Sequence, residues 1–506
     1  MLNIEKDDKQ TSVKSHSENI RQEGRWDKIY DTLQDESWIK SLGSKYLPVP
    51  SGILAEEDTQ LKTAMYNSYV SRAIFYRYVS NSIDSMKSLL TKKPVEIQLP
   101  EKMKILESNA GQGNDPLHII IARLFQAQLS YSRYGFLVDI PSGSVGTGVV
   151  PHILEYTHNK IVNWEVAPIN GKEKLVVLVL DESFTEVKKG LVTERVEKFR
   201  ICALANIGTE NQQYYTYTGD ASIIEEFEID QELPDGVVIP SIMGRTLNYI
   251  PFQPCNALGL EMYTEIPFLI AIADMALAIY RGEADYRQSL YQQGVATPYV
   301  TGTDVEANKI TYGASNLVVL NDANAKAGFI EVSGKGLNGM KLGLDGLHTQ
   351  QEKLGVSLIN AGANQSSEAL SIRLGIQTAS LAGLSATNKK CIESVLGFCA
   401  DWMGSNRDEI KLTYSTDFVN VQKPVDELEK LAKLVNLGNF TVDDYFDYLN
   451  KNEFTTFLNS DEWKNALEVD GLGLIDADTN SLIDSEKAKD KTDEPKQKEV
   501  SKEKKE

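Results

Sequence analysis

Residues 266–293, with the sequence IPFLIAIADMALAIYRGEADYRQSLYQQ, predict one long helix whose two halves differ in character. Up to Tyr280 the stretch is apolar apart from Asp274, and this run of about fifteen residues is too short and too polar to cross a bilayer. From Tyr280 onward the helix is polar on nearly every face, so that half either bridges solvent or lines an aqueous passage. At 1.5 Å per residue the whole helix spans about 40 Å.

The bulk composition favours a folded protein with an acidic surface. The chain has 506 residues, which is enough for two to four domains or for one elongated molecule of several layers. Its net charge is −20, from 72 acidic and 52 basic residues. Tight nucleic-acid binding depends on a basic surface that neutralises phosphates, so this balance argues against it. An acidic surface is still compatible with DNA that slides past without being held.

The cysteines and histidines give no sign of a metal centre. The four cysteines are isolated, without CxxC spacing, and the five histidines form no HxxxH pair. We therefore expect reduced thiols and no zinc site. The N-terminus has no apolar core, so it does not predict a signal peptide, and we expect a soluble intracellular protein. The cysteines are Cys202, Cys255, Cys391 and Cys399.

The residues before the long helix divide into a helical part and a β-rich part. Residues 1–25 are polar and charged, and we expect them to be disordered. The second of the predicted helices keeps apolar side chains at three- and four-residue steps until Pro94 stops it, and the third has Asp115 as its N-cap and ends at Gly135. From about 136 to 256, β-branched and aromatic runs predict an antiparallel β-rich domain. The predicted helices cover 26–43, 57–92 and 114–134.

Helices return in the second half of the chain. A short β-like insert separates the helix at 266–293 from the next one, and a charged, low-complexity tail that cannot build a core ends the chain. This order of elements predicts an α+β fold. The further helices are expected over 337–354, 366–403, 425–436, 442–450 and 460–467.

Asp139, in the stretch YGFLVDIPSGS, is the one residue that suggests catalysis. It follows a short apolar strand, which is where open α/β enzymes place catalytic or metal-binding carboxylates. A carboxylate enzyme also needs a second acid, a base or a metal cluster, and no such partner can be assigned from the sequence. Asp139 is well suited to accept hydrogen bonds from the N–H groups of the Pro-Ser-Gly turn that follows. We favour this structural role and keep a carboxylate-dependent hydrolase as an alternative.

Two glycine-rich stretches resemble phosphate-binding loops and fail the test for one. SGSVGTGVV is followed by Pro151 and strand-like residues instead of a helix N-terminus. GFIEVSGKGLNG has five residues, not four, between Gly328 and Gly334, and Gly336 stands where a Ser or Thr would bind magnesium. We therefore expect no nucleotide cofactor.

Two later helices carry apolar stripes that polar residues interrupt. In 337–354 the stripe Leu337, Met340, Leu344, Leu347 and Leu354 is broken at Gln351, and in 366–403 a similar stripe is broken at Asn388. Such stripes face the core of one monomer or pack helices side by side between the subunits of a ring. Periodicity does not choose between these two readings.

Four stretches, in this order, resemble the portal proteins of tailed double-stranded DNA phages, and within them a portal-like family long known only as a phage domain of unknown function. The first, 69–113, has an RA-aromatic helix, a Lys-Pro turn and a Leu-Pro, and the second, 131–143, has the segment YGFLVDIP. The third, 249–302, has IPF, an Asn, a helix with an AD pair and a Pro strand. The fourth, 328–404, has a helix, an LG turn, a Ser-rich break and a long helix ending in ADWMG.

The match covers about 57–405 and departs from the family at two points. Tyr134 stands where Arg is common, and SSEAL replaces the usual Thr-Ala at the Ser-rich break. The resemblance implies a portal-type fold with long stem, tunnel and wing helices. Its expected regions are a disordered N-terminus (1–25), a wing (26–260; helical over 26–134 and β-rich over 135–260), a stem, clip and tunnel-loop region (261–335), the tunnel helix with long wing or crown helices (336–405), a small helical crown (406–475) and a disordered charged tail (476–506).

The resemblance also implies a function. Portal proteins form a ring, typically of twelve subunits, at one capsid vertex, where they nucleate head assembly and act as the channel for genome packaging and ejection. The implied partners are the large terminase, the major capsid and scaffolding proteins, head-completion or tail adaptor proteins, and double-stranded DNA in transit. No enzyme activity, catalytic residue, metal, cofactor or membrane is implied. The protein would be found in the virion and, during assembly, in the host cytoplasm. A capsid or tail adaptor without a channel is the alternative from another class.

The candidate channel-lining residues lie on the polar half of the long helix and just before the next one. We expect the apolar half of 266–293 to pack against neighbouring subunits and the polar half to approach the channel. Residues 296–332 would form the clip and the approach to the tunnel loop, and the Gly-rich stretch 333–339 would be flexible and face DNA. Lys335 in that loop could contact phosphate, although a solvated surface lysine is the commoner outcome. The candidates are Arg281, Glu283, Asp285, Arg287, Lys335 and Asn338.

Overall fold

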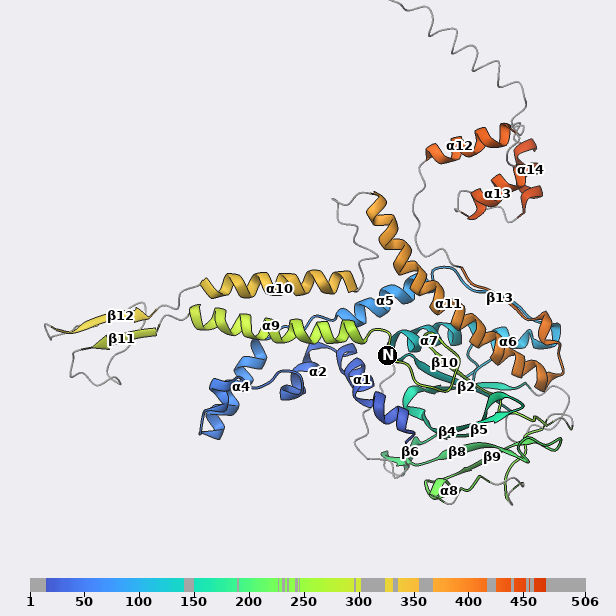
Figure 1. The fold of residues 1–506 in the computed structure, drawn as a ribbon, viewed down its shortest axis with the longest axis horizontal. Coiled ribbons are helices and arrows are strands. Elements are labelled where there is room, and N and C mark those ends of the chain that lie inside the picture. The colour runs from blue at the N-terminus through green and yellow to red at the C-terminus, as the bar shows by residue number, and fades with distance from the viewer. Residues whose placement is uncertain are drawn as a thin grey trace, which may run out of the picture. The chain divides into compact units, whose positions relative to one another are not determined.

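The computed structural model divides the chain into two compact units, residues 1–418 and 419–506, which are described separately (Figure 1). The described residues are 15–140, 150–188, 191–225, 227–229, 233, 236–241, 244, 246–294, 297–301, 324–330, 335–354, 367–415, 425–437, 441–451, 455 and 459–469. Both helices and strands are abundant, which confirms the predicted α+β class. The portal-specific details of that fold remain a prediction.

The first unit begins with helix α1, Ser17–Leu33, so the expectation of disorder over 1–25 is wrong for residues 17–25. Tertiary contacts override the polar composition there. The ring of His16 stacks on Trp164 with 3.8 Å between centroids, and the buried amide of Asn19 donates to the carbonyl of Ile161 at 2.7 Å. The short helices α2 (Glu36–Ser41) and α3 (Ser51–Leu54) follow.

The single helix expected over 57–92 is also wrong, because the chain forms two helices, α4 (Thr59–Arg72) and α5 (Tyr78–Leu90). Ala73 has extended backbone angles and ends α4. Ala73 and Phe75 are buried in the core, so the chain leaves the helical path at this point to place them there. The three- and four-residue apolar spacing continues through the break and conceals it in the sequence.

A third predicted helix is confirmed as α7, Leu117–Tyr131, with different ends from those expected. Pro116 takes the N-cap position, and Asp115 instead pairs with Arg123 at 2.7 Å. Ser132, in the left-handed conformation (φ 53°), ends the helix. Gly135 lies inside the next strand, where a Cβ would overlap the ring of Phe252, so the close packing here requires a glycine.

Strands occupy the region predicted to be β-rich after residue 136, and they pair in the antiparallel sense. One sheet has the order β10-β2-β3, and a second has the order β4-β5-β8-β9. The β6–β7 hairpin forms a sheet of its own, and β1 pairs with β13. The strands are β1 (Glu96–Gln98), β2 (Arg133–Asp139), β3 (His152–Thr157), β4 (Ile161–Ile169), β5 (Lys172–Asp181), β6 (Phe184–Lys188), β7 (Val192–Val196), β8 (Phe199–Ala205), β9 (Gln213–Gly219), β10 (Phe252–Asn256) and β13 (Lys411–Thr413); the short helices α6 (Ile105–Ser108) and α8 (Ser222–Glu225) lie among them.

Three long helices and a hairpin complete the first unit. Helix α9, Ile270–Gly294, leads into strand β11, Thr297–Thr301, and strand β12, Lys326–Ile330, leads back into α10, Lys335–Leu354. Helix α11, Ser367–Met403, is the longest element of the described chain. These elements confirm the expected helices and the β-like insert. All four cysteines are buried free thiols.

The second unit contains three short helices, as predicted: α12 (Val425–Asn436), α13 (Val442–Lys451) and α14 (Ser460–Val469). The ring of Trp463 on α14 packs on Tyr445 and Phe446 of α13. Phe446 is buried, so these aromatic contacts form the centre of the small unit. The tail expected to be disordered, 476–506, and residues 1–14 lie outside the described residues.

Candidate functional site: the α9–α10 helix pair

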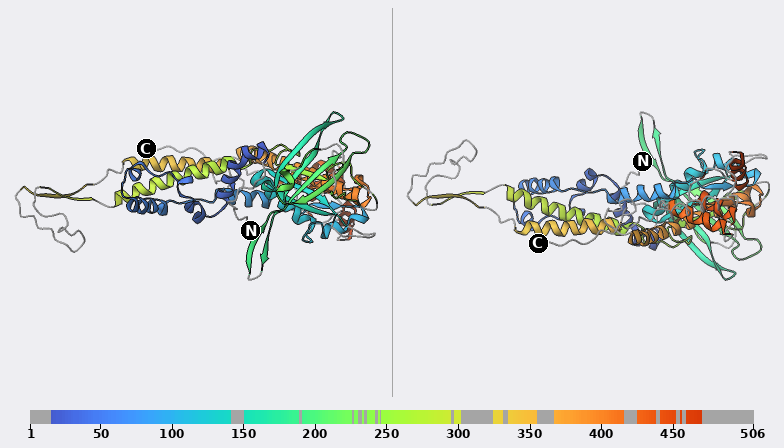
Figure 2. Two further views of the ribbon diagram at one scale, coloured as in Figure 1. Left: turned by 90° about the horizontal axis from the view of Figure 1, so that it is seen from below. Right: turned by 90° about the horizontal axis from the view of Figure 1, so that it is seen from above.

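Helices α9 and α10 lie side by side and run antiparallel, because the chain turns back through the β11–β12 hairpin at one end of the pair (Figure 1). Both views of Figure 2 show the same pairing. Gly282 permits this close approach, since a Cβ there would lie 2.7 Å from Cδ1 of Leu344. Helix α9 lies in the region expected from the sequence as the stem (261–335), and nearly all of α10 lies in the region expected as the tunnel helix (336–405).

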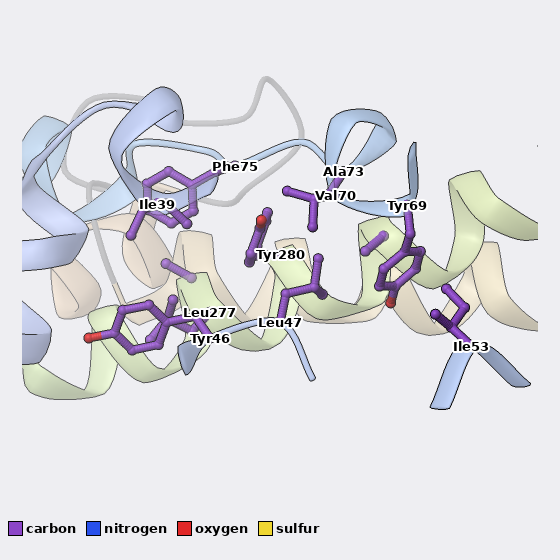
Figure 3. Close-up of a cluster of buried hydrophobic side chains, with 12 residues drawn as sticks. Ile39, Tyr46, Leu47, Ile53, Tyr69, Val70, Ala73, Phe75, Leu277 and Tyr280 are labelled. Atoms are coloured by element: carbon purple, nitrogen blue, oxygen red, sulfur yellow. The ribbon is translucent and has the colours of Figure 1, made fainter. Parts of the chain in front are cut away.

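The apolar half of α9 packs within its own chain, whereas the sequence analysis assigned it to neighbouring subunits. Leu277 and Tyr280 are buried against residues of α2, α4 and the segment before α5 (Figure 3). The ring of Phe75 meets that of Tyr280 edge to face at 5.9 Å. The side chains of Ile39, Tyr46, Leu47, Ile53, Tyr69, Val70 and Ala73 complete this cluster with Ala276 and Ala284. The N-terminal helices and the segments between them thus cover the apolar side of α9, for which the sequence alone gave no partner within the chain.

The polar half of α9 holds a buried carboxylate at the junction of three segments. Glu283 is only 4% exposed, and its Oε2 accepts a hydrogen bond from Nε of Arg287 at 2.7 Å. Its Oε1 accepts a hydrogen bond from the hydroxyl of Tyr76 at 3.1 Å and lies 3.8 Å from Nε2 of His348 on α10. Nδ1 of the same imidazole lies 2.6 Å from the hydroxyl of Tyr78, the first residue of α5. We call these five residues the Glu283 cluster.

The two tyrosines of the cluster are held in their neutral, hydrogen-bonding form. Burial raises the pKa of Tyr78 to about 12, with a further contribution from the nearby carboxylates of Glu352 and Glu283. Burial also raises the pKa of Tyr76, and the negative charge of Glu283 adds to the effect. Both hydroxyls therefore keep their protons at neutral pH, so the cluster can hold α5, α9 and α10 together through hydrogen bonds.

A second set of polar contacts ties α4 to the next turns of α9. The hydroxyl of Tyr69 donates to Oδ1 of Asp285 at 2.6 Å, and the guanidinium of Arg72 donates through Nε to Gln288 at 3.1 Å. The same guanidinium lies over the ring of Tyr291, 4.2 Å from its centroid. Helix α4 thus covers one side of the polar half, while α10 covers another.

The candidate residues of the polar half differ in their accessibility. Arg281 and Asp285 are exposed on α9, although Asp285 also accepts the bond from Tyr69. Glu283 is enclosed, and Arg287 is partly exposed but paired with it. The sequence had suggested a half-helix that is polar and open all round, and it gave no sign of Tyr76 or His348 as partners of Glu283.

The flexible loop expected over residues 333–339 is wrong for residues 335–339, because α10 begins at Lys335. Apolar residues at the spacing of Leu337, Met340 and Leu344 favour a helix here in spite of the glycines. Asn338 is exposed on this first part of α10. The side chain of Lys335, the residues 333 and 334, and most of the expected clip at 296–332 lie outside the described residues. Whether Asn338 faces a channel remains a prediction.

Asp139, the other candidate, lies in a network of charges within the β-rich domain. Its Oδ1 accepts the N–H of Ile140 at 2.8 Å, as expected of a turn, and its Oδ2 pairs with Arg200 of β8. Arg200 also binds Glu182, with 2.7 Å between Nε and Oε1. Burial alone would lower the pKa of Arg200, but these two carboxylates raise it above its ordinary value. The carboxylate of Asp139 is therefore engaged in holding strands together.

No group of three or more metal-ligating side chains gathers anywhere in the part of the chain that the structure describes. A polar hollow of about 640 Å³ lies between residues 246–249 and the C-terminal end of α11. Its carboxylate, Asp401, is already bound by the guanidinium of Arg407 (2.7 Å between Oδ1 and Nε) and by the hydroxyl of Tyr249. Burial favours a higher pKa for Asp401, but these hydrogen bonds hold it below its usual range. The hollow offers no free acid or base among its described lining residues.

Comparison with known proteins finds a matching family model and a set of similar solved structures, among them two neck assemblies. Residues 268–403, which run from just before α9 to the end of α11, match a domain of unknown function, DUF4055; this is well under half of the chain. No curated protein matches. The chain is similar to a subunit of the neck of an empty GTA particle computed with C6 symmetry (12% identity, 76% of this chain and 91% of that chain, TM-score 0.34). It is also similar to one from the neck of a native GTA particle computed with C12 symmetry (12%, 72% and 87%, TM-score 0.32). TM-scores this low do not establish a shared fold.

No described helix is long and apolar enough to cross a membrane.

Proposed function

We propose that this protein is a portal subunit, which assembles into a closed ring at one capsid vertex and forms the channel for DNA entry and exit. The observation that carries the proposal is the antiparallel α9–α10 pair with a β-hairpin at its end. These elements lie, in order, where the sequence resemblance predicts the stem, the clip and the tunnel helix. The β-rich domain follows the N-terminal helices in the order expected of the wing. The neck assemblies named above are consistent with a head-to-tail position but add no independent weight.

The charge of the chain supports a channel that lets DNA move. With a net charge of −20 per chain, acidic residues outnumber basic ones in a ring of these subunits, which disfavours net neutralisation of phosphates. Affinity from counterion release would then be low, so the duplex is repelled from the wall and slides. Among the described candidates, Arg281 and Asn338 fit the role of channel-lining residues best, because both are exposed. Portal rings use a head-to-tail interface between subunits, which closes only when the rotation between neighbours divides a full turn.

The other proposed partners follow from the same role. The large terminase would dock on the ring during packaging, the capsid and scaffolding proteins would surround it, and adaptor proteins would bind it when the head is complete. An adaptor without a channel is the competing proposal, and it predicts a different oligomer. A hydrolase based on Asp139 is disfavoured because that carboxylate is paired with Arg200.

The mass and shape of the purified protein test this proposal. We expect native mass spectrometry to give a ring of about twelve chains, the usual number for the family that the sequence resembles. Negative-stain images should show a central channel. A mass that stays monomeric or dimeric at every protein and salt concentration would contradict the proposal, and a ring without a channel would favour the adaptor.

The channel position of α10 has its own test. A cysteine introduced at Asn338 should react in assembled rings with a thiol reagent small enough to pass the channel, and a bulky adduct there should slow packaging. A cysteine at Lys188 on the exposed β6–β7 hairpin serves as the matched control, since its modification should leave packaging unchanged. An Asn338→Cys ring that packages DNA at the normal rate with the bulky adduct attached would place α10 away from the DNA.

A further inference from the structure

Helix α10 packs on the rest of the chain through an apolar face and, among its described side chains, through the polar contacts of one residue, His348. Leu344 is 8% exposed, and it sits where Gly282 of α9 leaves room for it. Among its described side chains, the hydrogen bond of His348 with Tyr78 is the one that links α10 to another described element. On another flank, Gly336, Gly339, Gly343 and Gly346 face open space, with nothing within 4 Å of an added Cβ. Few of the described side chains of α10 therefore fix its axial position relative to α9.

Gln351 is unexplained in the observed position of this helix. It is only 1% exposed, and neither its amide nitrogen nor its amide oxygen has a hydrogen-bond partner. A buried amide without partners is costly, and an apolar side chain would serve better at a position that only needs packing. The residue also interrupts the apolar stripe of α10 just after His348. A different position of the helix that gave this amide partners would remove the cost.

A displacement of three residues supplies those partners. Three residues correspond to a translation of about 4.5 Å and a rotation of about 60° in an α-helix. The displacement carries Leu347 to the place of Leu344 above Gly282, so one leucine replaces another in the packing against α9. It carries Gln351 to the place of His348, beside Tyr78 and Glu283. There the amide N–H₂ can donate to the carboxylate of Glu283, and the amide oxygen can accept from the hydroxyl of Tyr78.

We propose that α10 has two registers along α9, three residues apart, in which His348 and Gln351 alternate as the partner of Tyr78 and Glu283. The Glu283 cluster is the fixed half of this device, because its other members belong to α9, to the segment before α5 and to the first residue of α5. One-turn displacements of a helix between two packed positions are a known form of conformational switching. The two registers are a property of the single chain and do not depend on the proposed ring. In a ring, a change of register would shift α10 along its axis in each subunit.

Disulfide trapping within the full-length chain tests the two registers. The pair Gly282→Cys with Leu344→Cys should cross-link in the observed register, and Gly282→Cys with Leu347→Cys in the displaced one. The pair Gly282→Cys with Lys341→Cys is the matched control, because Lys341 lies three residues from Leu344 in the opposite direction. Cross-links are formed with a mild oxidant and identified as intrachain products by peptide mass, which separates them from bonds between subunits and from the native cysteines.

The proposal predicts that 282–344 and 282–347 both form, and that 282–341 forms at least ten-fold more slowly than either. His348→Ala should speed the 282–347 cross-link several-fold, and Gln351→Leu should slow it at least ten-fold without slowing 282–344. Cross-linking of all three pairs at similar rates would indicate a loose helix without registers, and failure of 282–347 beside a normal 282–344 would indicate a fixed one. Either result overturns the proposal. Because the readout is intrachain, it stands whether or not rings form.

The Gln351→Leu change in the chain without added cysteines gives a second readout. In the observed register this substitution removes an unpaired buried amide, so we expect a higher urea midpoint of unfolding. A lower midpoint would show that the amide already has a partner, which would remove the reason for a second register. Gln350→Leu, at the exposed neighbouring position, is the control and should leave the midpoint nearly unchanged.

Discussion

The β-rich domain and the α9–α10 pair both enclose carboxylates, but they use them in different settings. Asp139 and Glu182 share Arg200 inside a domain whose strands are already held by continuous ladders of backbone hydrogen bonds. Glu283 instead joins helical segments, which are not paired with one another in a β-sheet. Helix α10 contacts this carboxylate through His348. The first network stabilises strands that must keep one register, whereas the second joins helices that pack by side chains alone. The comparison suggests that the two regions differ in how freely they can rearrange.

The largest expected effect is in the β-rich domain. Arg200→Ala would leave Asp139 and Glu182 without their shared cation, and removing one partner of a buried ion pair typically costs about 3–5 kcal/mol. The side chains of all three residues are less than a fifth exposed, so water replaces the lost contacts poorly. Urea unfolding followed by circular dichroism measures the loss. Lys188→Ala, in the exposed pair with Glu194, is the control and should change stability by less than about 1 kcal/mol.

The helix pair should lose less from a comparable change. Glu283→Gln keeps the shape of the side chain and weakens its bonds to Arg287 and Tyr76, so we expect a loss of about 2 kcal/mol. Amide hydrogen exchange should show the loss in α9 and α10 and leave the strands of the β-rich domain protected. Asp285 is two residues further along α9 and is exposed, so Asp285→Asn should cost less than half as much stability. An equal loss of protection in both regions would mean that they unfold as one unit, and the contrast drawn above would fail.

The sequence predicted the elements better than their contacts, and the α4–α5 region shows why. Apolar spacing and helix-end residues located α7, α9, α10, α11 and the three helices of the second unit, because both signals can be read from positions that are close together in the sequence. They could not show the break at Ala73, since the residues around it are buried on both sides of the break and the spacing does not change. The helical start of α10 was missed for the opposite reason: glycines favour loops locally, and packing against α9 overrides them.

For the candidate sites, too, the sequence predicted local contacts and missed contacts with residues far away along the chain. A turn role for Asp139 could be inferred from the residues directly after it, and the bond from Ile140 agrees with that role. Its second partner, Arg200, lies 61 residues away, and pairing across strands cannot be read from one sequence. Glu283 was expected in solvent because its neighbours along α9 are polar. Its actual surroundings come from Tyr76 and His348, which belong to other segments.

Asp139→Asn separates the two contributions to that carboxylate. The substitution removes the charge opposite Arg200 but leaves an oxygen that can accept the N–H of Ile140, and Arg200 keeps Glu182. We therefore expect a loss of about 1–2 kcal/mol, with ring assembly and DNA packaging retained. The measurements are urea unfolding and native mass. A stable Asp139→Asn ring that has lost packaging would show that the carboxylate has a functional duty, and the hydrolase alternative would then have to be reopened.

The smallest expected effect concerns Asp401, which tests how far burial governs the whole series. Its side chain is 29% exposed and that of Arg407 is 47% exposed, so the pair should contribute only about 1 kcal/mol or less. The pKa of Asp401 is held below its unfolded value, so its contribution is present above about pH 4 and is lost as the pH falls through the folded pKa. Asp401→Asn should therefore cost stability at pH 7, and the difference from the unsubstituted chain should shrink below pH 4. Matched urea unfolding curves at pH 7 and pH 3 measure this. A difference that is as large at pH 3 as at pH 7 would assign the loss to the hydrogen bond from Tyr249 and not to the charge.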